Sequence, residues 1–255
     1  MIEQARVAPG RPGIYGWRAR IGLILPADNV LMEPELNALR IDGVTFHGLR
    51  LTATEPDRMR NQAVELAGTL VELGLDAAVY ACAETSFNGG SEVRQSLAGL
   101  VAAGCGLPTV TATDAMLAAA AHLGITNAAV VTPYNDDSGR HFEETLRGNG
   151  IRIASALHRD FARESDDARV WYLTNRQPPS EVYAMARKAD VFDADGIVIA
   201  ATNLPTFDII DHLERDAGKP VITSNQSIVW WLLRQLKIST AAMNLGSLMR
   251  SRGAA

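Results

Sequence analysis

Two stretches of the chain have a similar sequence, but only the first of them ends in a cysteine, the residue most suited to chemistry. The first runs from Asp76 through a short apolar segment to Cys82, and the second runs from Asp195 through a similar segment to Ala201. The spacing is constant, since 195 − 76 and 201 − 82 both equal 119. An acidic residue followed by an apolar run and then small residues is typical of a buried strand that leads into a tight loop. If the two loops face each other, one carries a thiol and the other only a methyl group.

The residues after Cys82 favour a chemical role for its thiol. A free cysteine in a protein interior usually packs as a small hydrophobic residue. Here, however, Gly89 and Gly90 allow the backbone to approach a ligand, and several polar side chains precede them. These are Glu84, Thr85, Ser86 and Asn88. Cys105 lies between two glycines without such neighbours, and we interpret it as structural. We expect the next helix near Ser91, too far from Cys82 for its dipole to lower the pKa of the thiol.

Short apolar runs alternate with stretches of helical period from residue 20 onward, as in βα units around parallel sheets. We predict strands at 21–25, 44–51, 77–81, 109–110, 128–132, 151–157, 197–200 and 221–223, and helices at 58–73, 92–103, 115–123, 142–147, 180–188, 207–215 and 228–236. Residues 23–29 also match 130–136, and 107–111 match 219–223. The chain is therefore predicted to be an α/β protein of two pseudo-symmetric, Rossmann-like halves. Each half holds a roughly four-stranded parallel sheet flanked by helices.

The repeat also predicts the domain organisation. Residues 1–19 form an N-terminal extension, 20–124 the first half with Cys82, 125–238 the second half with Ala201, and 239–255 a C-terminal tail. Residues 160–180 interrupt the symmetry with a polar segment that contains Pro178 and Pro179. Such a long polar connection can be a lid or an exposed loop, and both interpretations stay open.

Ligands of open parallel sheets bind outside the carboxyl ends of the strands, so we predict an active site in the cleft between the halves. Asn29 and Tyr134 occupy matching positions at predicted strand ends. Asn203 and Asn225 add neutral polar groups near other strand ends, although helix capping and turn formation also explain asparagines there.

Composition and motifs exclude several classes of function. The 255 residues are 47% hydrophobic and carry a net charge of −5, with scattered basic residues, so nucleic acid is an unexpected partner. Neither a P-loop, a Gly-x-Gly-x-x-Gly fingerprint nor a Gly-x-Ser-x-Gly elbow occurs. Two cysteines and dispersed histidines predict no metal site. Without a long apolar run or a signal-peptide pattern, we expect a cytoplasmic protein that does not bind membranes.

These motifs together resemble the Asp/Glu racemase superfamily, and within it the branch of maleate cis-trans isomerases and arylmalonate decarboxylases. The resemblance covers residues 20 to about 236. It is carried by LPADN at 25–29, YAC at 80–82, VTPY at 131–134, AATNLP at 200–205 and PVITSNQ at 220–226.

The resemblance implies an enzyme that binds a small carboxylic acid between its halves, uses no cofactor and forms a homo-oligomer. Each half of such enzymes contributes one cysteine. Cys82 matches the first, and Ala201 stands where the second is expected. Because racemisation by two bases needs an acid/base group on each face of the substrate, this departure disfavours a conventional amino-acid racemase.

Our leading hypothesis is an enzyme of the maleate isomerase type that acts on a small dicarboxylate through an enediolate. The resemblance implies that Cys82 serves as nucleophile or proton donor, and a thiolate is both a strong nucleophile and a competent leaving group. It also implies that Asn29 and Tyr134 hold a substrate carboxylate. We expect further substrate contacts from Ala83, Glu84, Ala201, Thr202, Asn203 and Asn225.

Two alternatives remain open. Arylmalonate decarboxylases have hydroxyl residues where this chain has Ala83 and Glu84, and their essential cysteine lies at the Ala201 position. Decarboxylation of an arylmalonate-like substrate would then use Cys82 as proton donor from the opposite face, with a product of opposite handedness. The other alternative is a catalytically reduced binding protein for small carboxylates, since a fold alone does not establish activity.

Overall fold

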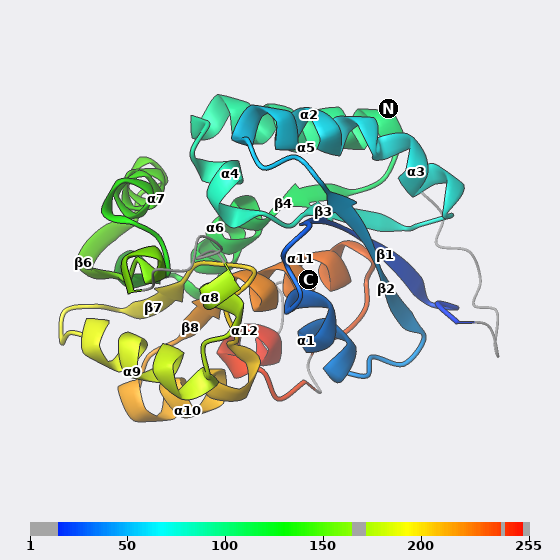
Figure 1. Cartoon of the computed structure of the whole chain (residues 1–255). Helices are drawn as coiled ribbons and strands as arrows, with labels where there is room; N and C mark the ends of the chain where they lie inside the picture. The colour runs from blue at the N-terminus through cyan, green and yellow to red at the C-terminus, as the bar shows by residue number, and fades with distance from the viewer. Residues whose placement is uncertain (1–14, 165–171, 241–242, 252–255) are drawn as a thin grey trace.

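The computed structural model describes residues 15–164, 172–240 and 243–251, and it contains two four-stranded parallel sheets (Figure 1). The first sheet has the order β2-β1-β3-β4, and the second has the order β6-β5-β7-β8. The strands are β1 (Ala19–Pro26), β2 (Val44–Leu51), β3 (Ala77–Tyr80), β4 (Thr109–Thr111), β5 (Asn127–Thr132), β6 (Arg152–His158), β7 (Gly196–Ile199) and β8 (Val221–Thr223). All six pairings are parallel, which confirms the predicted fold class.

The two central strands β3 and β7 confirm the repeat seen in the sequence. Each is four residues long, and all eight residues are buried, as expected for strands covered on both faces. Each is also preceded by the acidic residue of the repeat. The backbone N–H of Asp76 donates to Arg20 O at 2.8 Å, and that of Asp195 donates to Asn127 O at 2.8 Å. The equivalent strands therefore begin in the same way in both sheets.

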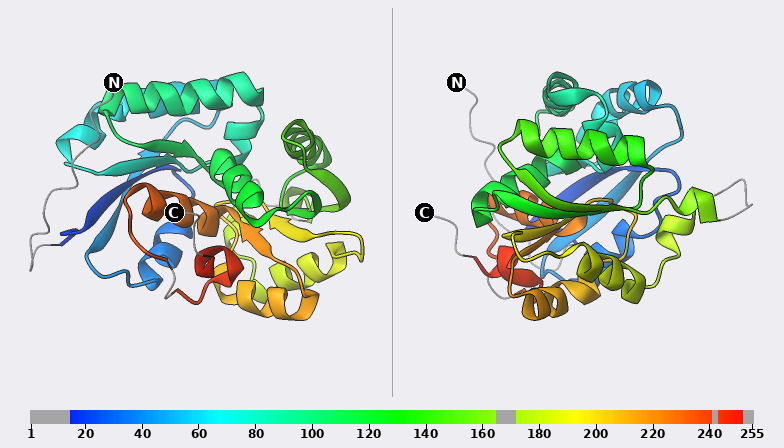
Figure 2. Two further views of the ribbon diagram at one scale, coloured as in Figure 1. Left: turned by 180° about the vertical axis from the view of Figure 1, so that it is seen from behind. Right: turned by 90° about the vertical axis from the view of Figure 1, so that its left-hand side faces the viewer.

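Helices cover the sheets in layers that are visible from several sides (Figure 2). Helices α2, α3 and α5 cover the outer face of the first sheet, α9 and α10 pack on the second, and α6 and α11 lie between the sheets. The helices are α1 (Met32–Ala38), α2 (Pro56–Glu65), α3 (Ala67–Glu72), α4 (Ala83–Phe87), α5 (Gly90–Cys105), α6 (Ala112–Leu123), α7 (Asp136–Gly148), α8 (Tyr172–Asn175), α9 (Pro179–Ala189), α10 (Ile210–Ala217), α11 (Ser224–Gln235) and α12 (Gly246–Arg250), with short 3-10 helices at Phe161–Glu164 and Phe207–Ile209.

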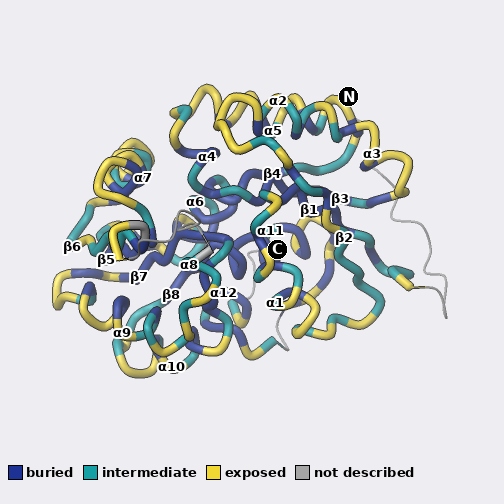
Figure 3. The backbone as a smooth tube through the Cα atoms, viewed as in Figure 1, coloured by how far each residue is buried: buried dark blue, intermediate teal, exposed yellow. Residues whose placement is uncertain are grey.

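The main hydrophobic core is shared by the two halves. It contains Leu23 and Val79 from the first sheet and Val130 and Ile197 from the second, all 0% exposed. Strands β1, β3, β5, β7 and β8 are mostly buried, the edge strands β2 and β6 are half-buried, and the outer helices expose one face to solvent (Figure 3). The halves therefore form one packed body, and the carboxyl ends of both sheets are held in a fixed relation.

Several predicted helix boundaries are wrong. The predicted helix 58–73 is divided at Leu66 into α2 and α3. Helix α7 begins at Asp136 rather than at 142, because the Asn135 side chain caps it by accepting a hydrogen bond from Ser138 N at 2.9 Å. The short helices α1, α4, α8 and α12 were not predicted, because helices of four to seven residues give too little periodicity to detect.

The predicted terminal segments are only partly described. Strand β1 begins at Ala19, the last residue of the expected N-terminal extension, and residues 1–14 lie outside the described residues. Within the expected C-terminal tail, α12 packs Leu248 and Met249 into the main core, both 0% exposed. Backbone N–H groups of Gly246 and Ser247 donate to carboxylates of α10 at 3.1 and 2.7 Å. This part of the stretch therefore belongs to the fold of the second half.

The polar segment 160–180 is described at its two ends. The first end is the 3-10 helix Phe161–Glu164, and the second contains α8, while 165–171 lie outside the described residues. In α8, Asn175 Nδ2 donates to Asp28 O at 3.3 Å. Within the described ranges, no helix is both long and apolar enough to cross a membrane, and no group of three or more potential metal ligands occurs.

Candidate active site

Four loops meet where the strand order of each sheet reverses. After β1 the chain forms β2 on one side of β1 and then crosses to form β3 on the other side. Strands β5, β6 and β7 repeat this arrangement in the second sheet. Such switch points are where open α/β sheets bind ligands. The loops that follow these strands carry Asn29, Cys82, Tyr134 and Ala201. We call residues 80–85 the first wall and residues 199–204 the second wall of this candidate site.

Cys82 is positioned directly before a helix, and the expectation that the next helix begins near Ser91 is wrong. Helix α4 starts at Ala83, and Cys82 is its N-cap residue, with extended backbone angles of φ −121° and ψ 103°. The first N–H groups of a helix have no intrahelical partner and point toward the N-cap. Gly90, with φ 76°, then lets the chain turn sharply from α4 into α5. The reactive candidate therefore sits beside several backbone donors.

The thiol of Cys82 is held in its neutral form. The residue is a free, half-buried cysteine, and burial raises the pKa of its thiol to about 11. The nearby carboxylates of Glu84 and Asp28 raise this pKa further, whereas hydrogen bonding from Thr85 lowers it. Because the pKa lies well above neutrality, the unliganded site holds a protonated thiol that can donate a proton.

Tyr134 approaches the thiol from the other half. Burial raises the pKa of its hydroxyl well above the usual range, and the charges of Glu84 and Cys82 raise it further. The ring packs against Phe87 with centroids 5.7 Å apart. In α7, Ser138 Oγ donates to Glu84 Oε1 at 2.6 Å, a contact between the halves that the sequence did not suggest. The structure thus brings Cys82, Glu84 and Tyr134 together.

Asn29 joins the two walls through a chain of hydrogen bonds. Its Nδ2 donates to Thr202 Oγ1 at 3.1 Å, and Thr202 Oγ1 donates to Ala81 O at 2.9 Å. Asn29 Oδ1 accepts the N–H groups of Leu31 and Met32 at 3.2 and 3.0 Å, so it also caps the start of α1. The side-chain oxygen of Asn29 is therefore occupied by helix capping. Its amide group carries two hydrogens, of which one bonds Thr202, so the other can bond a ligand.

The second wall uses its polar groups for internal support. Ala201 N donates to Ser224 Oγ at 3.1 Å, and this hydroxyl donates to Met116 Sδ at 3.1 Å. Asn225 Nδ2 donates to Glu35 Oε2 at 2.7 Å and to Thr202 O at 3.0 Å. Both amide hydrogens of Asn225 are therefore committed to acceptors within the protein. Asn225 supports Thr202 instead of offering a free donor to a carboxylate.

Glu35 is a supporting residue that the sequence analysis missed. Its Oε1 accepts the backbone N–H groups of Thr206 and Phe207 at 2.7 and 3.0 Å, so α1 of the first half is fastened to the second half. Burial raises the pKa of its carboxyl group, although these hydrogen bonds and that from Asn225 oppose the shift. Met32 and Leu36 of α1 are both buried and have helical spacing, but two apolar residues are too few to predict a helix from the sequence.

The predicted site residues differ in how far their side chains are exposed to solvent. Cys82, Glu84, Tyr134 and Asn203 are partly exposed. The buried group consists of Asn29, Ala83, Ala201, Thr202 and Asn225.

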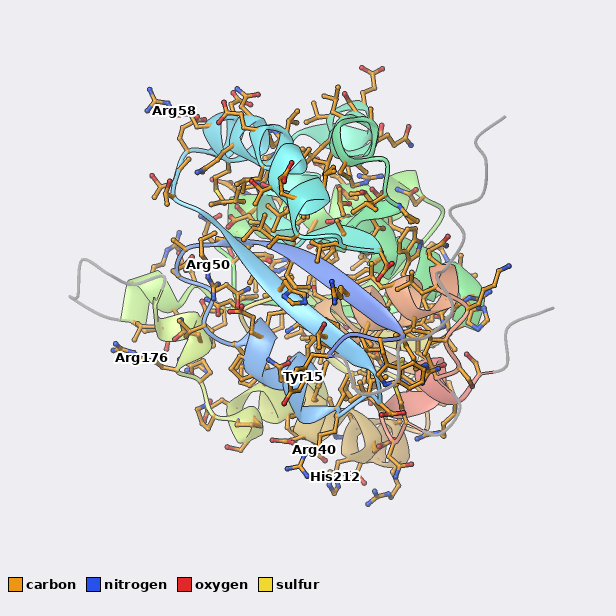
Figure 4. All side chains as sticks on the ribbon, turned by 90° about the vertical axis from the view of Figure 1, so that its right-hand side faces the viewer. Tyr15, Arg40, Arg50, Arg58, Arg176 and His212 are labelled. Carbon is orange, nitrogen blue, oxygen red and sulfur yellow. The ribbon has the colours of Figure 1, made fainter. Side chains whose placement is uncertain are left out.

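Basic residues lie mostly outside this arrangement. Arg40, Arg58 and His212 point outward from the molecule (Figure 4). Arg50 of β2 donates to Asn29 O at 2.6 Å and pairs with Glu33. Arg50 therefore stabilises the backbone of the loop after β1. The groups that act on the thiol are the carboxylates of Asp28 and Glu84 and the polar groups of Thr85.

This combination of two four-stranded parallel sheets, with a thiol at one strand end and a methyl group at the equivalent end, defines an α/β protein of two similar halves with a candidate site between them. The sequence profile described as arylmalonate decarboxylase matches residues 21–249, and the chain belongs to that family.

Characterised relatives include both kinds of enzyme in this branch. A maleate isomerase from Geobacillus stearothermophilus is 26% identical, with 91% of this chain and 98% of the relative covered. An arylmalonate decarboxylase from Bordetella bronchiseptica is also 26% identical, with 83% and 85% covered. An isomerase and a carboxy-lyase are thus both among the relatives, which confirms the predicted branch.

Solved structures share the fold. A maleate cis-trans isomerase mutant from Nocardia farcinica, with a covalently bound succinylcysteine intermediate, superimposes with a TM-score of 0.83 at 24% identity. The alignment covers 92% of this chain and 99% of that one. An arylmalonate decarboxylase structure gives a TM-score of 0.78 at 22% identity, with 91% and 100% covered. At this identity the likeness establishes the architecture.

Proposed function

We propose that the protein is a cofactor-independent isomerase that acts on a small cis-unsaturated dicarboxylate such as maleate, with Cys82 as its only reacting thiol. The observation that carries this proposal is the position of Cys82, half-buried at the start of α4 and beside Tyr134. Four relatives that match at least 90% of this chain are maleate isomerases.

The proposed isomerisation needs chemistry from one wall only. The thiolate of Cys82 adds to an alkene carbon, and the π electrons move into the adjacent carboxylate to give an enediolate. The former double bond is now a single bond and rotates. Collapse of the enediolate then expels the thiolate and forms the trans alkene, so no net proton is consumed.

Donors around the thiol support this intermediate. The first N–H groups of α4, the Tyr134 hydroxyl and the remaining amide hydrogen of Asn29 can stabilise the enediolate oxygens. Preorganised donors of this kind contribute about 3 to 4 kcal/mol each toward a developing oxyanion. The carboxylates of Glu84 and Asp28 are the groups near the thiol that can accept its proton before addition.

A second candidate function, decarboxylation of an arylmalonate, is favoured by the neutral state of the thiol. Loss of carbon dioxide from a malonate leaves an enediolate that must take up one proton. A thiol whose pKa is raised to about 11 is protonated at neutral pH and is ready to donate it. Ala201 has no proton to donate, so protonation would come from the first wall alone and give one enantiomer.

Parallel assays of the purified protein test both candidates. Maleate is incubated with the protein and fumarate is quantified by chromatography, while a methyl-substituted arylmalonate is monitored for carbon dioxide and for product handedness. We expect fumarate formation above the background of a Cys82→Ala variant. Turnover of neither substrate, with both shown to bind, would reject the enzyme proposals and support a binding protein.

The pH profile separates the two roles of the thiol. Below the pKa of the thiol, the thiolate becomes about tenfold more abundant with each unit of pH increase, so isomerisation should accelerate as the pH rises toward 11. A proton donor is already fully protonated at neutrality, so the rate of decarboxylation should be flat from pH 7 to about 10 and fall as the pH approaches 11. A flat profile for maleate would contradict the nucleophilic role.

A further inference from the structure

A buried hydroxyl pair lies next to the reacting thiol and has no role in the steps described above. Tyr80 OH and Thr85 Oγ1 are 2.6 Å apart. Tyr80 is 0% exposed and Thr85 is 6% exposed, so water has little access to either group. Arg60 Nη1 donates to Thr85 O at 3.1 Å and holds this turn of α4 from the side of α2. The pair is therefore a fixed part of the first wall.

Local geometry directs both hydroxyl residues toward Cys82. Tyr80 and Cys82 are two residues apart on extended backbone, so their side chains leave the same face of the strand. Thr85 is three residues after the N-cap, the position whose N–H faces the N-cap side chain. The thiol makes no regular capping bond in its neutral form, but the hydroxyl and N–H of Thr85 lie close enough to lower its pKa.

The second wall offers a comparison within the same molecule. The offset of 119 residues that relates β3 to β7 places Ile199, Ala201 and Leu204 at the positions of Tyr80, Cys82 and Thr85. These three residues are 0%, 5% and 0% exposed. None has a side-chain hydrogen-bonding group. The wall without a thiol thus lacks both hydroxyls as well.

We propose that Thr85 is a positioning residue for Cys82: its hydroxyl donates a hydrogen bond to the thiolate while the Tyr80 hydroxyl donates to Thr85 Oγ1. No proton is transferred along this chain, and the two hydrogen bonds only stabilise the charge on sulfur. Hydrogen bonds to a charged group in a buried site are stronger than those between neutral groups. The inference rests on the proposed function in one respect, namely that Cys82 reacts in this site.

The charges around Cys82 explain why its thiolate needs a hydrogen-bond donor such as Thr85. From the loop after β1, Asp28 disfavours the thiolate, and so does Glu84 from α4. The Tyr134 hydroxyl approaches from the second half, and the Arg60 guanidinium acts on Tyr80 from α2. Hydrogen bonding by the hydroxyl and the backbone N–H of Thr85 opposes these charges and lowers the pKa of Cys82.

Alkylation by iodoacetamide tests this proposal without requiring a substrate. The experiment uses a Cys105→Ala background, so that Cys82 is the only thiol, and follows modification by mass spectrometry from pH 7 to 10. Loss of the Thr85 hydroxyl in Thr85→Val should raise the pKa of Cys82 and reduce the thiolate population about tenfold. A thiolate of higher pKa is intrinsically more nucleophilic, which offsets about threefold of this loss in rate. We therefore expect alkylation at pH 8 to slow about threefold or more.

Two further variants make the test specific. Thr85→Ser should restore the rate to within about twofold of the parent, because the hydroxyl is retained. Tyr80→Phe should slow alkylation less than Thr85→Val, because it removes only the second bond of the chain. The matched control is Ser86→Ala, which removes a buried hydroxyl of the same helix that bonds Ala83 O and Thr113. We expect Ser86→Ala to leave the rate unchanged.

Clear outcomes would overturn the proposal. Thr85→Val alkylated at the parent rate, or slowed no more than Ser86→Ala, would show that the hydroxyl does not act on the sulfur. Circular dichroism identifies a variant that fails to fold, in which case Thr85→Ser and Tyr80→Phe still decide the result. If the protein converts neither maleate nor an arylmalonate but these rates shift as expected, the proposed function fails while the role of Thr85 stands.

Discussion

The first and second walls have the same backbone and opposite chemical character. Both follow a four-residue parallel strand at the centre of a sheet, and both strands are completely buried. In the first wall the side chains include a phenol, a thiol and a hydroxyl, whereas the equivalent side chains of the second wall are aliphatic. The comparison teaches that this fold sets the geometry of both walls, and that a few side chains decide which wall carries groups capable of reaction.

Even the supports behind the walls correspond. Thr113 Oγ1 donates to Ala83 O at 3.3 Å, and Asn225 Nδ2 donates to Thr202 O at 3.0 Å. Each donor comes from the first turn of the helix after the last strand of its half, and each holds the residue that follows Cys82 or Ala201. The second wall therefore has the same supporting framework as the first, although it carries no thiol.

Removal of the thiol should have the largest effect on this comparison. In Cys82→Ala both walls end in a methyl group, so we expect turnover to fall about a thousandfold, the range typical for loss of a reacting acid or nucleophile. Cys105→Ala removes the other cysteine and should retain full turnover, since Cys105 is buried away from the strand ends. Equal turnover by Cys82→Ala and the parent enzyme would show that the first wall is not the reactive one.

Tyr134→Phe tests whether the reactive wall depends on a donor from the other half. The ring and its contact with Phe87 are retained, and only the hydroxyl is lost. We expect a fall in kcat of about a hundredfold, as for removal of one oxyanion donor, with little change in KM. A rise in KM alone would mean that the hydroxyl binds the ground state and the transition state equally.

Ala201→Cys tests whether the second wall can be made reactive. Ala201 N is already fixed by Ser224, so a new side chain should project from an ordered backbone. With an arylmalonate we expect the parent protein to give one enantiomer and Ala201→Cys to give a mixture, because a thiol then stands on each wall. Chiral chromatography measures the ratio. An unchanged single enantiomer would show that the second wall does not reach the substrate.

Glu35→Gln should have the smallest effect, and it appears in the pH dependence of stability. The raised pKa means that the folded protein holds this proton more tightly than the unfolded chain does, so Glu35 makes the free energy of unfolding fall as the pH rises from about 4.5. Glutamine does not titrate, so this fall should be smaller in the variant. Urea unfolding at several pH values measures it, with Glu33→Gln on the same helix as control. If the free energy of unfolding had the same pH dependence in Glu35→Gln as in the parent protein, burial of the Glu35 charge would not destabilise the fold.

The sequence was sufficient to predict the two sheets and the matching loops that form the two walls. Buried parallel strands give continuous apolar runs, and the repeat of Asp76–Cys82 at 195–201 fixed the correspondence of β3 and β7. Helix α4 was missed because five residues show no periodicity, and with it the N-cap position of Cys82. The contacts of Glu35 and Ser138 could not be predicted, because they join residues 190 and 54 positions apart across the two halves.

The hydrogen bond between Glu84 and Ser138 connects the electrostatic surroundings of the Cys82 thiol with the packing of the two halves. Glu84 lies two residues after Cys82 on the first half, while Ser138 belongs to α7 of the second. A change in the packing of the halves that breaks this hydrogen bond would move a negative charge relative to the sulfur. The pKa of Cys82 therefore depends on residues of both halves, so substitutions in α7 that alter this contact should change the rate of thiol alkylation.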